Sequence, residues 1–154
     1  MVRPDSPLGA NSYWIVVADE FQAVLYAREK KFSPLQELTS LQNETAREKM
    51  ENLVSDRSGR GFDSQGQGRH AYTKEKSGPK SQSYAAFAKE IAEQVRVGRQ
   101  GNRFDRLAVI AAPRFLGVLR NALARAGAVP DLTIDKEVTG KDAAFIQKLI
   151  DDNQ

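Results

Sequence analysis

The chain has 154 residues, of which 40% are hydrophobic and 28% are charged, and its formal net charge is +3 at pH 7. This length fits one domain with its own core, and the composition is ordinary for a soluble globular protein. The sequence has no cysteine, which excludes disulfides, cysteine-ligated zinc and thiol nucleophiles. It shows neither the apolar region of a signal peptide nor a membrane-spanning run, so we expect a cytoplasmic protein without membrane insertion.

The first half of the chain predicts strands. Residues 1–11 contain two prolines and a glycine, and we expect a flexible lead-in to a single domain at 12–154. The continuous β-branched and aromatic run YWIVVA predicts a central strand buried on both faces, with Trp14 in the core. Asn43 is expected to cap a short helix that reaches about residue 53. The predicted strands are 13–18, then 23–28 as the second arm of a hairpin, and 35–41 at an edge.

The second half alternates helices with strands. Apolar residues at helical spacing predict a helix over 83–97, ended by Gly98 and Gly101. The run LAVIAA predicts a buried strand at 107–112, and Pro113 then opens a helix that reaches about Ala126. A half-exposed strand follows over 132–138. Thr139 and Asp142 resemble a capping box for a last helix, whose predicted inner residues are Phe145, Ile146, Leu149 and Ile150.

This order of elements predicts an α/β fold. The antiparallel strands come first, and the strand–helix crossovers that follow require parallel pairing. We therefore expect a mixed five-stranded sheet with helices on both faces. Asp19 ends the central strand, where it could ligate a metal or simply begin a turn. The strand at 107–112 ends without a carboxylate, so we predict no metal site and no cofactor.

Between the two halves lies a glycine-rich stretch, residues 54–80, which we call the basic segment. It holds five of the eleven glycines and the single histidine, with six basic and three acidic residues. Its balance of +3 equals that of the whole chain, so the rest sums to zero. A loop this long without secondary structure is unusual and is commonly functional or disordered.

The residue types of the basic segment point to binding of RNA or another polyanion. Cations and a glycine backbone can approach phosphates, and a histidine or tyrosine ring can stack on a base. Arg114, in the first turn of a predicted helix, could join them or could pair with Asp56 or Asp63 to hold the segment. The predicted RNA-binding residues are Arg57, Arg60, Arg69, His70, Tyr72, Lys74 and Arg114.

Three blocks of sequence together resemble a known family. They are YWIVVAD at 13–19, VSDRSGR at 54–60 with Arg69 and His70 beyond it, and APRFLGVLR at 112–120. In this order they are similar to the bacterial host attachment protein family, named for a requirement in attachment to host cells. The family in turn resembles the middle domain of eukaryotic and archaeal peptide-chain release factors. That resemblance implies a ribonuclease-H-like mixed sheet with a glycine-rich loop ahead of a long helix.

The resemblance leaves the molecular activity open. Release factors hydrolyse peptidyl-tRNA through a Gly-Gly-Gln motif, and this chain has Gln65-Gly66-Gln67-Gly68 in its place. We therefore expect a non-enzymatic protein that contacts a ribosome or tRNA through the basic segment. The alternatives are a peptidyl-tRNA hydrolase that uses Gln65, Gln67 or His70, and a protein–protein interaction module with an anionic partner. The oligomeric state is not indicated.

Overall fold

The computed structural model describes residues 12–29, 33–48 and 79–153. They form one five-stranded sheet in the order β3-β2-β1-β4-β5. The central strand β1 (Tyr13–Ala18) pairs antiparallel with β2 (Gln22–Arg28) and parallel with β4 (Arg106–Ala111). Strands β3 (Gln36–Gln42) and β5 (Leu132–Asp135) form the two edges. The predicted mixed sheet is confirmed.

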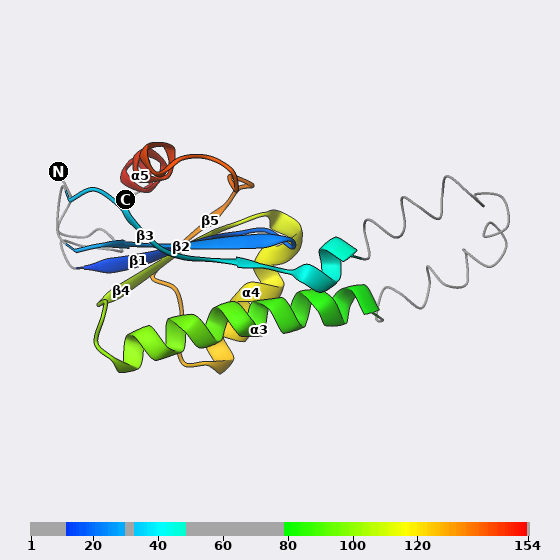
Figure 1. The fold of residues 1–154 in the computed structure, drawn as a ribbon. Helices are drawn as coiled ribbons and strands as arrows, with labels where there is room; N and C mark the ends of the chain where they lie inside the picture. Colours follow the sequence, from blue (N-terminus) through cyan, green and yellow to red (C-terminus); the bar gives the residue numbers. More distant parts are fainter. Residues whose placement is uncertain (1–11, 30–32, 49–78, 154) are drawn as a thin grey trace, which may run out of the picture.

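Helices cover both faces of this sheet, as Figure 1 shows. Helices α3 (Pro79–Gln100) and α4 (Pro113–Arg125) lie together on one face, and α5 (Ala143–Asp152) lies on the other. Alternate residues of β1 point to the two faces, so Val16 joins the core beneath α3 and α4 while Ile15 joins the core beneath α5. This explains why every residue of β1 is buried. None of the described helices combines the length and apolarity needed to cross a bilayer.

Helix α3 differs from its prediction at both ends. It begins four residues earlier than expected, at Pro79, and it continues through Gly98 to Gln100. Gly98 does not end the helix. A side chain at this position would have no room, because a Cβ there would lie 2.3 Å from Cη2 of Trp14. Trp14 itself is 5% exposed and stacks on Phe104 with ring centroids 4.7 Å apart. The expected core position of Trp14 is confirmed.

The last helix also begins differently from the prediction. Asp142, and not Thr139, caps α5, because its Oδ1 accepts a hydrogen bond from the backbone N–H of Phe145 at 2.9 Å. The capping-box interpretation was therefore wrong about Thr139. Phe145 is 45% exposed and lies under the ammonium of Lys141, whereas Ile146 and Ile150 are buried as expected.

Asn43 forms the predicted cap after β3. Its Oδ1 accepts from the backbone N–H of Ala46 at 3.2 Å, and a helical stretch covers 44–48. The remainder of the helix expected to reach residue 53 lies outside the described residues.

Candidate functional site

The candidate site lies at the edge of the sheet where β1, β4 and β5 end. Carboxyl ends of parallel strands are the usual location of ligand sites in open α/β sheets. Asp19 follows β1 directly, and its Oδ1 accepts from the N–H groups of Phe21 and Gln22 at 2.8 and 2.9 Å. Its Oδ2 accepts from the hydroxyl of Thr139 at 2.6 Å. Asp19 thus shapes the hairpin turn and also ties it to the chain after β5.

Glu20, the next residue, is a buried carboxylate, with only 1% of its surface exposed. Its Oε2 accepts from Nε of Arg114, and Nη2 of the same guanidinium donates to Oε1 of Glu137 at 3.0 Å. The other carboxylate oxygen of Glu20 is buried, and no described residue donates to it. The hydrogen bond to Glu20, more than any other contact, raises the pKa of Arg114, which therefore stays charged.

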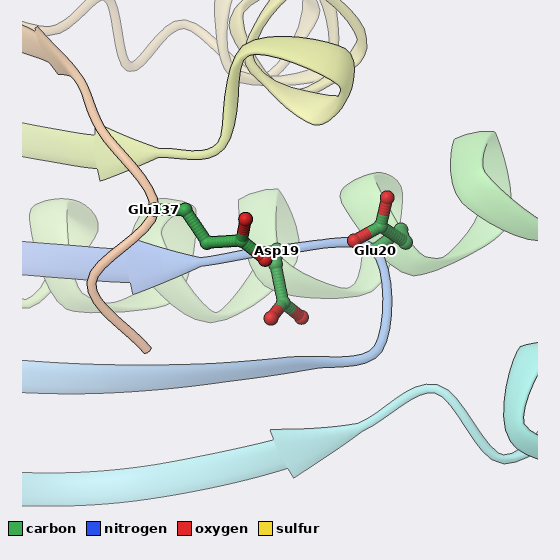
Figure 2. A group of neighbouring side chains, drawn as sticks. All are labelled: Asp19, Glu20 and Glu137. Atoms are coloured by element: carbon green, nitrogen blue, oxygen red, sulfur yellow. The ribbon is translucent and has the colours of Figure 1, made fainter. Parts of the chain in front are cut away.

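Figure 2 shows how the three carboxylates converge: Asp19 and Glu20 lie just beyond β1, and Glu137 lies in the segment that follows β5. One oxygen of each lies within 4.8 Å of the others, a spacing that a divalent cation could use. However, the guanidinium of Arg114 already bonds to two of them, and both oxygens of Asp19 accept hydrogen bonds from the protein. We therefore assign Arg114 as the cation that balances this group.

A second polar contact joins the stretches of chain that come before and after residues 49–78. The Nδ2 of Asn43 donates to the backbone carbonyls of Glu20 and Ser83, at 3.0 and 3.4 Å. The hydroxyl of Ser83 donates back to Oδ1 of Asn43 at 3.3 Å. We call this pair the Asn43–Ser83 clamp. Because both side chains are buried, it fixes the first turns of α3 against the end of β3.

Tyr84 follows Ser83 of the clamp in the chain and lies near Glu20 of the carboxylate group. Its ring meets Phe115 edge-on, with centroids 6.4 Å apart. Burial raises the pKa of the Tyr84 phenol, the negative charge of Glu20 adds to this rise, and Arg114 opposes it. The start of α3, the start of α4 and the end of β1 therefore share one polar corner of the domain.

Most of the predicted site residues cannot be placed in this corner. Arg57, Arg60, Gln65, Gln67, Arg69, His70, Tyr72 and Lys74 lie outside the described residues. Arg114 does lie at the expected sheet edge, where its described partners are Glu20 and Glu137. The predicted pairing with Asp56 or Asp63 lies outside the described residues. Sequence reasoning missed Glu20, Glu137 and Thr139. Only the position of Glu20, two residues after a fully buried strand, could have indicated its burial.

Charge is distributed unevenly along the described chain. From Ser83 onward, α3 and α4 carry six basic residues (Lys89, Arg96, Arg99, Arg114, Arg120 and Arg125) and two acidic residues (Glu90 and Glu93). The rest of the described chain, outside these two helices, carries seven basic and thirteen acidic residues. The two helices on this face of the sheet thus carry the excess of positive charge in the described chain, and α3 begins where the basic segment ends in the sequence.

Comparison with known proteins gives a family but no described activity. A solved structure, "Crystal structure of the Thermoplasma acidophilum Pelota protein", is similar over 89% of this chain, with 12% sequence identity and a TM-score of 0.46. That similarity covers 31% of the Pelota chain, so the present chain spans less than a third of its length. The curated proteins contain no significant match. The family described as "Protein required for attachment to host cells" matches residues 14–150, and the chain belongs to this family.

Proposed function

We propose that the protein is a cytoplasmic, non-enzymatic binding protein that contacts RNA, on a ribosome or a tRNA, through the basic segment. The observation that carries this proposal is the uneven charge: the positive helical layer adjoins a segment that itself holds six cations against three acids. Positive charge concentrated in one part of a protein attracts a polyanion over a range set by ionic strength. Any effect on attachment to host cells would then be indirect.

The Asn43–Ser83 clamp supports the same proposal. It holds the residues on either side of 49–78 at one corner of the domain, with both side chains buried. A binding segment that starts and ends on a rigid scaffold loses less conformational entropy on binding than one tethered loosely. The fold therefore provides a defined base for the basic segment.

Arg114 has a different part in this proposal. Its guanidinium is engaged by Glu20 and Glu137, so its charge is largely balanced within the protein. We assign it to the support of the corner and leave direct phosphate contact to the cations of the basic segment. Loss of Arg114 would then lower the free energy of unfolding and leave the salt dependence of RNA binding nearly unchanged.

The proposal is tested by measuring binding of fluorescein-labelled tRNA and poly(U) over a series of salt concentrations. With about four phosphate contacts, log affinity should fall against log salt with a slope of roughly −3 to −4. Changing Arg57, Arg60 and Arg69 together to alanine should weaken binding and bring the slope close to −1. The matched control removes three positive charges from the α5 side of the sheet, at Lys136, Lys141 and Lys148, and should leave most of the slope intact.

Two results would contradict the proposal. Equal weakening by both triple variants would show that net charge, and not the basic segment, governs binding. Release of the peptide from peptidyl-tRNA on stalled ribosomes, lost when Gln65 and Gln67 are changed to alanine, would show a hydrolase instead of a binding protein.

A further inference from the structure

Helices α3 and α4 leave a groove on their outer surface, away from the sheet. The groove has a volume of about 670 Å³. Its lining is dominated by small apolar side chains, among them Ala85, Ala92, Ala122 and Ala126. Alanine at these positions lets the two helices approach closely but gives no side chain long enough to fill the outer seam. The seam therefore stays open as an apolar hollow in a polar surface.

The sides of this groove are positively charged. Lys89 and Arg96 of α3 and Arg125 of α4 line it, with Glu93 as the single acidic residue of the lining. Glu93 already accepts a hydrogen bond from Arg96 at 2.9 Å, so it balances that arginine. Lys89 and Arg125 are exposed, and neither forms an ion pair with any described residue. They are placed on opposite helices, one on each side of the apolar hollow.

We infer that this groove docks an acidic amphipathic helix of a partner protein. An apolar stripe on such a helix would lie against the alanines, and acidic residues beside the stripe would face Lys89 and Arg125. Recognition of a helix in an apolar groove uses residues spaced at i, i+3, i+4 and i+7, and charges at the rim set its orientation and specificity. The small floor residues allow the close backbone approach that a third helix requires.

Two other occupants fit less well. A single-stranded nucleic acid stacks its bases on aromatic rings, and no aromatic residue lines this groove. Asn121 is the one uncharged polar residue of the lining. A second copy of the chain using the same groove would bring two positively charged groove rims together, since a two-fold contact uses the same surface on both copies. Repulsion between like charges opposes that contact.

The probe for this inference is a labelled 18-residue synthetic peptide with an alanine and leucine stripe flanked by glutamates. Fluorescence anisotropy with the full chain should give a dissociation constant in the micromolar range, and amide chemical shifts should move along α3 and α4. Reversing two charges of the groove, with Lys89→Glu and Arg125→Glu, should weaken binding at least tenfold. Arg120→Glu, on α4 but outside the groove lining, is the matched control and should change binding less than threefold.

Several results would overturn the inference. They are no binding at 1 mM peptide, equal binding of a peptide with lysines in place of the glutamates, or equal loss in the Arg120→Glu control. Loss of poly(U) binding in the Lys89→Glu, Arg125→Glu variant, with peptide binding unchanged, would assign the groove to RNA. The triple alanine variant of the basic segment should bind the peptide normally, so failure of this inference is separable from failure of the proposed function.

Discussion

Replacement of Arg114 by alanine should destabilise the protein by about 3 kcal/mol, because it would leave a charge buried without a partner. Glu20 is 1% exposed, and Arg114 is the only described residue that donates a hydrogen bond to its carboxylate. Removing one member of a buried ion pair commonly costs about 3–5 kcal/mol. We take the lower end because the Arg114 side chain is 54% exposed, so water can enter the space that it leaves.

The assay is unfolding in urea, followed by circular dichroism, with thermal unfolding as a second measurement. For a chain of this length a loss of about 3 kcal/mol should lower the melting temperature by about 6–12 °C. Two variants serve as comparisons. Arg120→Ala removes an exposed arginine from the same helix and should cost less than about 0.5 kcal/mol. Glu20→Gln removes the buried charge but keeps an acceptor, and should make a subsequent loss of Arg114 cost only about 1 kcal/mol.

Equal effects of Arg114→Ala and Arg120→Ala on the free energy of unfolding would contradict this prediction. That result would mean that Glu20 finds water or another donor without penalty. Equal costs of the Arg114 change in the wild-type and Glu20→Gln backgrounds would also refute it, because the double-mutant cycle would then show no coupling between the two side chains.

Four further substitutions test the rest of the scaffold by the same urea assay. Gly98→Ala should lower the free energy of unfolding by about 2 kcal/mol, because its new Cβ would collide with Trp14. Gly117→Ala, whose Cβ would meet no atom within 4 Å, should instead stabilise α4 by up to about 1 kcal/mol. Equal effects of the two substitutions would show that packing against Trp14 does not decide the outcome. Asn43→Ala should lower the free energy of unfolding by about 2–3 kcal/mol, because it removes the helix cap and the two hydrogen bonds to backbone carbonyls. It should also increase proteolytic cleavage in the stretch that joins β3 to α3. Thr139→Val should cost about 1–2 kcal/mol, and no measurable change would show that its hydrogen bond to Oδ2 of the turn carboxylate is unimportant.

Much of the fold could be predicted because its signals are local. The six apolar residues of β1 and the helical spacing of Phe87, Ile91 and Val95 identify buried elements whatever surrounds them. Errors arose where a local signal had a non-local cause. Gly98 resembles a helix stop in sequence, but its small size is required by a ring on a strand more than eighty residues away. Thr139 resembles a helix cap, yet its hydroxyl bonds to Asp19 across the sheet edge.

The polar corner could not be predicted, because it depends on the order of the strands in space. Glu20 and Glu137 are separated by more than a hundred residues, and they meet Arg114 only because β4 lies between β1 and β5. Strand order does not follow from the periodicity of any single strand. A charged residue whose partner comes from a neighbouring strand end therefore looks like a free cation in the sequence.

Arg114 does not add to the positive charge that is available to a partner. In the sequence, Arg114 counts as one more cation available to an anion, and in the structure it is the counter-ion of a buried carboxylate. The two proposals therefore assign partners to two other sets of cations, those of the basic segment and Lys89 and Arg125 at the groove rim. The first offers glycines and cations suited to phosphates, and the second offers cations beside an apolar floor suited to a helix. If both proposals hold, one domain binds a nucleic acid and a protein through different residues.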